Sequence, residues 1–237
     1  MNIQNQIIEY IQHNRISTTE VADALGKKGV MRNVVAITND VFKVGAIRPV
    51  FISYGSNYAL HEQIRDVQPN EIVIIFTYEC DERAALGDLV AKYVLLYRGA
   101  TAIVTDGLIR DVSRIKREHY PIWAKGCTAL GCFNQPVDPF PKKLEQEIRN
   151  EYEGGVAICD DGGVTIIKSE LVKQDTLDAL KRIELQEDVW YYCLDTLKWD
   201  TKKIVCDKAY LNESDELPDT YKSKLADLSI PFDKIKK

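Results

Sequence analysis

Residues 71–76 limit most strongly what this chain can fold into, because they read Glu-Ile-Val-Ile-Ile-Phe without polar alternation. An uninterrupted apolar run of this length predicts a strand that is covered on both faces, as strands of parallel sheets are. A second short apolar run, Ala102–Thr105, follows residues 89–97, whose pattern predicts a helix. The sequence therefore predicts a buried sheet whose strands are joined by helices.

The segments around these two runs complete an alternating order. Residues 34–52 predict two or more strands around Gly45 and Pro49, and residues 58–66 predict a short helix. Residues 112–118 predict a further helix, and a short apolar segment follows at residues 121–124. The order β-α-β-α-β implies parallel strands joined by right-handed crossovers. A chain of 237 residues can form one such α/β domain with appendages.

Both ends of the chain are predicted to be mainly helical. Isoleucines at helical spacing predict a first helix that stops near Asn14, and the capping box Ser17-Thr-Thr-Glu20 begins a second helix that ends by Gly26. Later segments predict a charged helix, a hairpin that turns at Asp161-Gly162 and a largely helical stretch, at residues 140–152, 155–167 and 169–197.

The composition limits the partners of this chain. It holds 31 Lys and Arg against 36 Asp and Glu, so its net charge of −5 provides no basic field for nucleic acid or an anionic membrane. No uncharged run is long enough to span a bilayer, and the first residues lack a basic region followed by an apolar one. We expect a cytoplasmic protein that binds neither nucleic acid nor a membrane.

Cysteine and histidine usage narrows the kinds of metal site that the chain could form. None of the six cysteines forms a CxxC pair, and the three histidines are scattered. A structural zinc site and a Ser-His-Asp triad therefore have little support. Any metal is expected to be a hard ion held by oxygen atoms, such as magnesium or manganese.

Arg110 and Asp111 form the candidate functional pair, at the end of the segment Ala102-Ile-Val-Thr-Asp-Gly-Leu-Ile-Arg-Asp111. A divalent ion on Asp111 could bind the carboxylate and keto oxygens of a 2-oxo acid, while Arg110 neutralises the carboxylate and stabilises a developing enolate. Arg-Asp pairs that follow strands are also common as surface salt bridges, so the pair alone leaves both interpretations open.

A second polar position precedes this pair along the predicted sheet. Gly87-Asp88 and Arg110-Asp111 follow two successive predicted strands, and open α/β sheets bind ligands outside the carboxyl ends of their strands. The two acidic positions are therefore expected to face one cleft. Gly87-Asp88 also begins a helix, where the free backbone N–H groups of Leu89 and Val90 suit a carboxylate or phosphate. Asp106 is expected instead to accept hydrogen bonds from backbone amides of its turn.

Several ordered motifs point to a family. They are Ser17-Thr-Thr-Glu-Val-Ala-Asp-Ala-Leu-Gly26, Asn57-Tyr-Ala-Leu-His61, Gly87-Asp-Leu-Val-Ala91, Asp106-Gly-Leu-Ile-Arg-Asp111 and Tyr120-Pro-Ile-Trp-Ala-Lys-Gly-Cys-Thr-Ala-Leu-Gly131. With these motifs the chain resembles the RraA-like family, whose members include the class II 4-hydroxy-4-methyl-2-oxoglutarate aldolases and the regulator of ribonuclease activity A.

The resemblance implies an α/β single domain of the swivelling β/β/α type, with the parallel β-α-β-α-β core and here a helical C-terminal extension. It also implies a homotrimer or a dimer of trimers, with the active site near a subunit interface. We place the RraA-like domain at residues 1–200, with an atypical segment at 132–153, and the extension at residues 201–237.

The resemblance also implies roles for individual residues. Asp111 would coordinate Mg²⁺ or Mn²⁺, and Arg110 would bind the keto acid and stabilise its enolate. The amides of Leu89 and Val90, which follow Gly87, would hold the substrate carboxylate. Asp88 would act as a catalytic residue through metal-bound water.

The chain departs from the family pattern at two places. Twenty-one residues separate Asp88 from Arg110, one more than in the family's aldolases, and the additional residue is expected in the helix at 89–97 or its C-terminal turn. Residues 132–153 form a proline-containing, charged segment where members usually continue into a Gly-Gly strand and a Pro-Gly-Asp turn. The acidic residue that a neighbouring subunit is expected to provide is therefore not located by the sequence.

Two functions follow from these observations. The first is a divalent-metal-dependent lyase that cleaves or decarboxylates a small 2-oxo acid through a pyruvate enolate. The alternative is a non-catalytic regulator of the RraA type that inhibits a ribonuclease or another enzyme through the altered segment 132–153 and the C-terminal region. The sequence specifies neither the particular 2-oxo acid nor its pathway.

Overall fold

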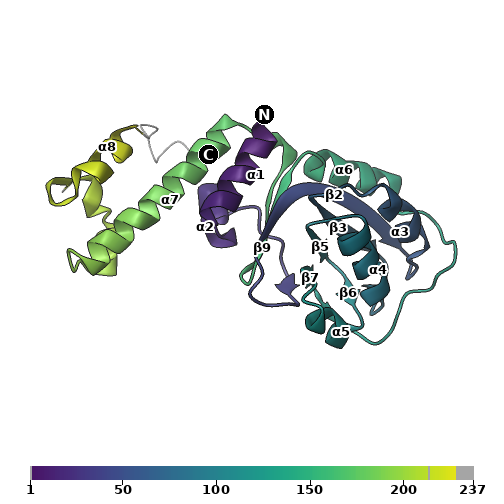
Figure 1. The fold of residues 1–237 in the computed structure, drawn as a ribbon. Helices are drawn as coiled ribbons and strands as arrows, with labels where there is room; N and C mark the ends of the chain where they lie inside the picture. The colour runs from purple at the N-terminus through teal and green to yellow at the C-terminus, as the bar shows by residue number, and fades with distance from the viewer. Residues whose placement is uncertain (1, 213, 228–237) are drawn as a thin grey trace.

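The computed structural model describes residues 2–212 and 214–227 and shows an α/β body with a helical lobe at one end (Figure 1). The body contains a seven-stranded sheet of order β1-β7-β5-β3-β2-β9-β10. Its strands are β1 (Val35–Ala36), β2 (Lys43–Ser53), β3 (Glu71–Tyr78), β5 (Ala102–Thr105), β7 (Ile122–Ala124), β9 (Val156–Asp160) and β10 (Gly163–Ile167). Strands β2, β3, β5 and β7 are parallel neighbours, which confirms the predicted β-α-β-α-β core.

The segment at residues 29–36 brings the two edges of this sheet together. At one edge β1 pairs with β7, and at the other Val30 forms an antiparallel bridge with Thr165 of β10. The N–H of Met31 donates to the carbonyl of Val164 at 2.9 Å. The sheet is therefore nearly closed, which agrees with the predicted α/β fold class.

Strand β2 passes without a break through Gly45 and Pro49, the two positions around which the sequence predicts separate strands. Pro49 has no N–H to donate, and it is tolerated because β9 pairs with β2 only at Lys43–Ala46. Phe51, two residues further on, directs its backbone to the same open edge. There its N–H donates to Oε1 of Gln63 at 3.0 Å, and Nε2 of Gln63 donates to its carbonyl at 2.8 Å.

Side chains of β3 alternate between two hydrophobic cores, one on each face of the sheet. Val73 and Ile75 face a core that includes residues of α3 (Tyr58–Gln63), α4 (Asp88–Lys92) and α5 (Val112–Arg117). Ile72, Ile74 and Phe76 face the opposite core, which packs against α6 (Lys142–Tyr152). The strand is therefore covered on both faces, as its apolar sequence predicts.

A second sheet was not predicted from the sequence. It consists of three parallel strands in the order β4-β6-β8, namely β4 (Ala84–Leu86), β6 (Leu108–Ile109) and β8 (Gly126–Cys127). Strands of two or three residues are too short to show a hydrophobic period, so the sequence does not reveal them. As a consequence, Gly87-Asp88 follows β4 rather than β3, and Arg110-Asp111 follows β6 rather than β5.

Helices α1 (Ile3–Asn14), α2 (Thr18–Ala24) and the first half of α7 (Gln174–Asp195) pack together beside β9 and β10. Ser17 caps α2 in a capping box with Glu20, as predicted. Leu180 of α7 is fully buried in this cluster, so the first half of α7 is anchored to the body. Two single 3₁₀ turns, η1 (Ile64–Asp66) and η3 (Ser169–Leu171), end α3 and precede α7.

The second half of α7 leaves the body and carries a separate helical lobe (Figure 1). The lobe has its own hydrophobic core, formed by Leu185, Val189, Cys193, Trp199, Ile204, Ala209, Tyr210 and Leu217. Its further elements are η4 (Lys202–Cys206), η5 (Ala209–Leu211), η6 (Ser214–Glu216) and α8 (Asp219–Asp227). The predicted helical C-terminal extension is thus present up to residue 227, and the part of that prediction at 228–237 lies outside the described residues.

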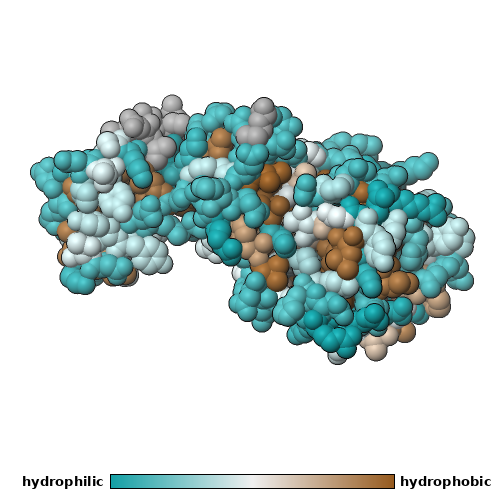
Figure 2. All heavy atoms as spheres, in the orientation of Figure 1, coloured by the Kyte–Doolittle hydropathy of each residue, from teal (hydrophilic) through white to brown (hydrophobic). Residues whose placement is uncertain are grey.

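The lobe presents a mostly hydrophilic surface on the face shown in Figure 2. Over the described residues, no helix combines the length and the apolar character that crossing a membrane requires.

Candidate functional site

Strands β4 and β6 bring two carboxylates to one edge of the small sheet. The strands are parallel with Leu86 opposite Ile109, so Gly87-Asp88 and Arg110-Asp111, which follow them, lie side by side. The N–H of Asp88 donates to Oδ2 of Asp111 at 3.2 Å. The N–H of Arg110 donates to the carbonyl of Leu86 at 3.0 Å. The two predicted acidic positions therefore meet, at the ends of β4 and β6 instead of β3 and β5.

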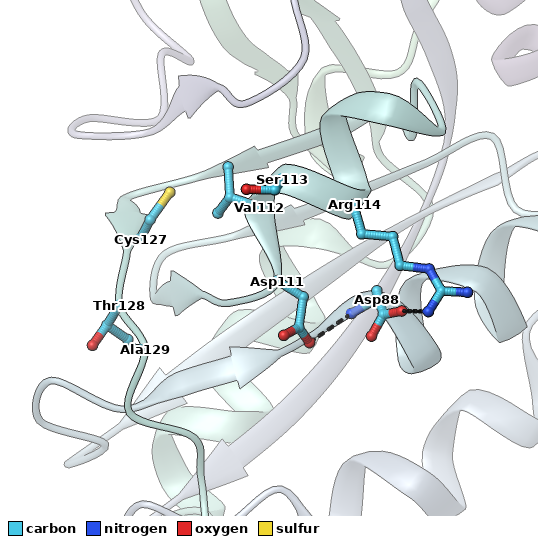
Figure 3. Close-up of a pocket in the computed structure, with 8 residues that line it drawn as sticks. All are labelled: Asp88, Asp111, Val112, Ser113, Arg114, Cys127, Thr128 and Ala129. Atoms are coloured by element: carbon cyan, nitrogen blue, oxygen red, sulfur yellow. Dashed lines mark hydrogen bonds and ion pairs between the residues drawn. The ribbon is translucent and has the colours of Figure 1, made fainter.

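Asp111 has a left-handed backbone conformation, with φ 60° and ψ 30°, at the N-cap position of α5. Such a conformation costs of order 1–3 kcal/mol for a residue other than glycine, although aspartate tolerates it better than most. An N-cap carboxylate normally accepts a hydrogen bond from its own helix, but Asp111 makes no capping bond. Its carboxylate faces the neighbouring α4 instead (Figure 3), which leaves it available for a ligand.

Arg110 lies in a cradle formed by two glycines. A Cβ on Gly87 would lie 3.1 Å from both Cγ and Nε of Arg110, and 2.2 Å from Oδ2 of Asp111. A Cβ on Gly131 would lie 2.3 Å from Nη1 of Arg110. The Arg110 guanidinium is about half exposed, with Nε 3.6 Å from Oδ2 of Asp111. Both glycines thus leave room for the close approach of the arginine side chain.

Arg114 is a site residue that the sequence did not reveal. Its Nη1 lies 3.0 Å from Oδ2 of Asp88, and this ion pair joins α5 to α4 (Figure 3). The sequence signal that could have revealed Arg114 is its position in the first turn of the helix that follows Asp111. Arg114 holds the Asp88 carboxylate in a fixed direction, although the pair is too exposed to add much stability.

An open pocket of about 660 Å³ lies in front of these carboxylates. Asp88, Asp111 and Arg114 line it together with five residues from the start of α5 and the end of β8, namely Val112, Ser113, Cys127, Thr128 and Ala129 (Figure 3). The sequence predicted none of these five as site residues, and Cys127, Thr128 and Ala129 reach the pocket through the pairing of β8 with β6. The pocket is polar on the carboxylate side and has hydroxyl groups close by.

The first turn of α4 adds hydrogen-bond donors beside the pocket. Its N-cap is Gly87, which has no side chain to cap the helix, and Ala91 makes the first intrahelical bond, to Gly87. The amides of Leu89 and Val90 therefore have no acceptor within the helix. The Leu89 side chain is 76% exposed and that of Val90 is buried, so only their backbone groups suit a polar ligand.

The helix after Asp88 contains a π turn. After α4 it continues as a π-helical turn, η2 (Tyr93–Tyr97), in which the N–H of Arg98 donates to the carbonyl of Tyr93 at 3.0 Å. A π turn holds more residues than an α turn. The turn lies in the segment where the additional residue between Asp88 and Arg110 is expected, and that placement stays a prediction.

Asp106 has a structural place in the turn after β5. Its Oδ1 accepts a hydrogen bond from the Thr77 N–H at 2.9 Å. Burial raises the pKa of Asp106, and the hydrogen bonds from Thr77 oppose this rise. The carboxyl ties β5 to β3 and is not among the residues that line the pocket.

The donors at the pocket suit a hard divalent ion. The structure offers the carboxylates of Asp88 and Asp111 and the hydroxyl groups of Ser113 and Thr128. Mg²⁺ commonly uses one or two protein carboxylates and takes its remaining ligands from water and substrate. The described residues contain no cluster of three or more His, Cys, Asp or Glu, so a site here would depend on such outside ligands.

The fold and the pocket define an α/β protein whose candidate site lies at the carboxyl ends of short parallel strands. The chain belongs to the RraA-like family, described as Aldolase/RraA, whose family model matches residues 18–166. That range contains the whole pocket and ends before α7. The C-terminal lobe lies outside it.

Similar proteins agree with this assignment. A protein of Halalkalibacterium halodurans named "Putative 4-hydroxy-4-methyl-2-oxoglutarate aldolase" is 27% identical over 169 residues, which cover 68% of this chain and 77% of that protein. The structure of RraAS2 from Streptomyces coelicolor, described as an unusual member of the RNase ES inhibitor RraA protein family, aligns with a TM-score of 0.60 at 18% identity. The alignment covers 78% of this chain and 95% of that one.

A structure of an uncharacterized protein from Pseudomonas syringae pv. tomato shows the same fold, with a TM-score of 0.59 at 16% identity. It covers 81% of this chain and 93% of that protein. The family includes both proteins named as aldolases and ribonuclease inhibitors. Membership in the family therefore supports the fold but does not distinguish between these two activities.

Proposed function

We propose that this protein is a divalent-metal-dependent lyase that acts on a small 2-oxo acid, by retro-aldol cleavage or by decarboxylation through a pyruvate enolate. The observation that carries the proposal is the meeting of the Arg110 guanidinium and the Asp111 carboxylate over Gly87, next to an open pocket that Asp111 lines and Arg110 does not. The aldolase name of the Halalkalibacterium halodurans relative supports the same reaction class.

Each side chain has a distinct part in this proposal. Asp111, with Asp88 beside it, would hold Mg²⁺ or Mn²⁺. Such an ion, when bound, supplies Lewis-acid stabilisation of negative charge on the keto oxygen. Arg110 binds the substrate carboxylate, assisted by the amides of Leu89 and Val90, and its positive charge stabilises the enolate as it forms.

The electron pair of the broken bond determines what the site must stabilise. In oxaloacetate the bond between C3 and C4 breaks, CO₂ leaves, and the electron pair forms the enolate of pyruvate, which takes a proton at C3. Arg114 orients the Asp88 carboxylate, and Asp88 would direct the water that carries this proton. None of the residues that line the pocket is a lysine, which agrees with a route that needs no Schiff base.

We also propose that the protein assembles as a homotrimer or a dimer of trimers with the site near a subunit interface. Leu89, Leu96 and Tyr97 are between 62% and 76% exposed on the helix α4–η2, whose first residue, Asp88, lines the pocket. Hydrophobic side chains gathered on a helix next to a site are typical of a surface that another protein covers. A neighbouring subunit seated there would also narrow the open pocket.

A metal-dependence assay tests the proposed reaction. Purified protein is incubated with oxaloacetate and other 2-oxo acids, and pyruvate release is followed with Mg²⁺, with Mn²⁺ and after removal of metal by a chelator. We expect decarboxylation that needs the metal and falls at least tenfold in Arg110→Ala. Turnover that persists unchanged after chelation, or in Arg110→Ala, would contradict the proposal.

A second candidate function is inhibition of a ribonuclease or another enzyme by protein binding. The observation that favours it is the helical lobe that begins in the second half of α7, which lies outside the family match and exposes Tyr191, Leu194, Val205 and Leu211. A pull-down would distinguish the two functions. A stoichiometric enzyme partner that is inhibited by Asp111→Ala as strongly as by the wild type would favour the regulator.

A further inference from the structure

Arg114 has donors that its ion pair with Asp88 does not use. Its Nη1 lies 3.0 Å from Oδ2 of Asp88, and its side chain is 54% exposed. A guanidinium has five N–H donors, and the Arg114 side chain makes no other ion pair within the part of the chain that the structure describes. Its remaining N–H groups are therefore accessible to a ligand of the pocket, which Arg114 lines (Figure 3).

Arg114 is also the cation of the pocket itself. Among the eight described residues that line the pocket, it is the only one with a positive charge. Arg110 lies in the glycine cradle next to the pocket and does not line it. A substrate whose 2-oxo acid group is bound at Arg110 and Asp111 would therefore have the pocket for the rest of its chain, and Arg114 is the cation that this part of the substrate would meet.

The two arginines and the two aspartates of the site form a row. Nε of Arg110 lies 3.6 Å from Oδ2 of Asp111, and the same oxygen accepts a hydrogen bond from the N–H of Asp88. The Asp88 carboxylate in turn pairs with Arg114. Two guanidinium groups, at the two ends of the row, therefore flank two carboxylates.

The charges of this row favour one class of substrate. The two arginines and the two aspartates balance each other, so the divalent ion of the proposed function would give the site a net positive charge of two. A 2-oxo acid with a single carboxylate would compensate half of this charge, whereas a substrate with a second anionic group would compensate all of it. The four side chains are partly exposed, so solvent and salt reduce this preference without removing it.

We propose that Arg114 is a specificity-determining residue, which binds a second anionic group, carboxylate or phosphate, at the end of the substrate remote from its 2-oxo acid group. This inference rests on the proposed lyase function, because that function assigns the 2-oxo acid group to Arg110 and Asp111. A guanidinium binds carboxylates and phosphates with two parallel N–H···O bonds. The hydroxyl groups of Ser113 and Thr128 are further donors that line the same pocket.

The binding role of Arg114 can be separated from its contact with Asp88. Loss of the ion pair with Asp88 should slow every substrate by the same factor, since Asp88 acts at the common 2-oxo acid end. Loss of a bond to the second anionic group should slow only the substrates that have such a group. The ratio of kcat/KM between an anionic and a neutral substrate therefore reports the binding role alone.

Turnover of three substrates with Mn²⁺ tests this assignment. They are 4-hydroxy-2-oxoglutarate, which ends in a carboxylate, 2-oxo-3-deoxy-6-phosphogluconate, which ends in a phosphate, and 4-hydroxy-2-oxopentanoate, which ends in a methyl group. For the wild type we expect kcat/KM to be about tenfold to 100-fold higher for at least one anionic substrate than for the neutral one, the effect of one hydrogen bond between charged groups. The preferred anionic substrate identifies the distal group.

Two arginine variants of the same helix show whether Arg114 causes this preference. In Arg114→Gln the kcat/KM ratio should fall close to one. Arg117→Gln is the matched control, because it removes the same charge from α5 at a side chain that is 71% exposed and does not line the pocket, and its ratio should stay as in the wild type. Equal kcat/KM for the three substrates in the wild type would overturn the assignment, as would an equal loss for all three in Arg114→Gln.

A binding measurement distinguishes failure of this assignment from failure of the lyase function. 2-Oxoglutarate and 2-oxopentanoate have no 4-hydroxyl group for retro-aldol cleavage and differ only in the distal carboxylate, so calorimetry can compare their Kd values for the Mn²⁺-loaded protein. We expect 2-oxoglutarate to bind about tenfold more tightly, and to lose this advantage in Arg114→Gln but not in Arg117→Gln. Such a preference without any turnover would support the assignment and contradict the lyase, whereas turnover without a preference would do the reverse.

Discussion

Two glycine-to-alanine substitutions test whether the arginine cradle positions the reactive groups. In Gly87→Ala the new Cβ would lie 2.2 Å from Oδ2 of Asp111, and in Gly131→Ala it would lie 2.3 Å from Nη1 of Arg110. Gly87 has an extended backbone, with φ −130°, that alanine can adopt without strain. Each substitution should therefore displace one functional side chain and leave the backbone in place.

The size of the effect follows from these distances. An ordinary contact between such atoms is about 3.5 Å, so each side-chain end must move by about 1 Å. A misplacement of this size costs about 100-fold in rate, or about 2.7 kcal/mol in transition-state stabilisation. The displaced groups are flexible side-chain ends, so the free energy of unfolding should change by less than about 1 kcal/mol.

The assay compares kcat/KM for oxaloacetate decarboxylation with Mn²⁺ and the free energy of unfolding in urea. Gly126→Ala is the matched control, because its Cβ would meet only Cδ2 of Leu108, at 3.3 Å. We expect both cradle variants to fold and to lose about two orders of magnitude in kcat/KM. Cradle variants with wild-type kcat/KM, or an equal loss in Gly126→Ala, would refute the reasoning.

Three further changes test other parts of the structure. Arg114→Ala should lower kcat several-fold because Asp88 loses its ion-pair partner, and Arg114→Lys should restore part of it. The free energy of unfolding should change by less than about 1 kcal/mol, since the pair is exposed. An unchanged kcat in Arg114→Ala would show that Arg114 has no role at the site. Burial raises the pKa of Asp106, so the folded state binds the carboxyl proton more tightly than the unfolded state does. The free energy of unfolding should therefore decrease as the pH rises above about 4, where Asp106 of the unfolded chain loses its proton. Asp106→Asn should flatten that decline in Tm, and a parallel profile would contradict it. Ile204 is 2% exposed, so Ile204→Ala should destabilise the lobe by about 2–5 kcal/mol. Amide hydrogen exchange should become faster in the lobe alone. Faster exchange in β3 as well would mean that the lobe and the body unfold together.

The large sheet could be predicted from the sequence because its signals are local. The apolar run at β3 and the helix pattern at residues 89–97 each extend over at least one full period of their structure. The small sheet had no such signal, because β6 and β8 have two residues each. The predicted meeting of Asp88 with Asp111 was correct, although it depends on this small sheet.

Contacts between distant segments account for what the sequence did not reveal. Arg114 reaches Asp88 across two helices, and Gly131 packs against the Arg110 guanidinium, which only the folded chain brings next to it. No periodic pattern links positions that are 26 or 21 residues apart in this sequence. The roles of Asp88, Arg110 and Asp111 in catalysis stay predictions.

One measurement tests the central proposal most directly. The initial rate of oxaloacetate decarboxylation is recorded over a series of Mn²⁺ concentrations for the wild type, Asp111→Asn and, as a matched control on the body surface, Asp161→Asn. We expect the rate of the wild type and of Asp161→Asn to saturate with Mn²⁺, and Asp111→Asn to show no Mn²⁺-dependent rate at the same concentrations. A rate in Asp111→Asn that saturates as in the wild type would contradict a metal-dependent lyase at this pocket.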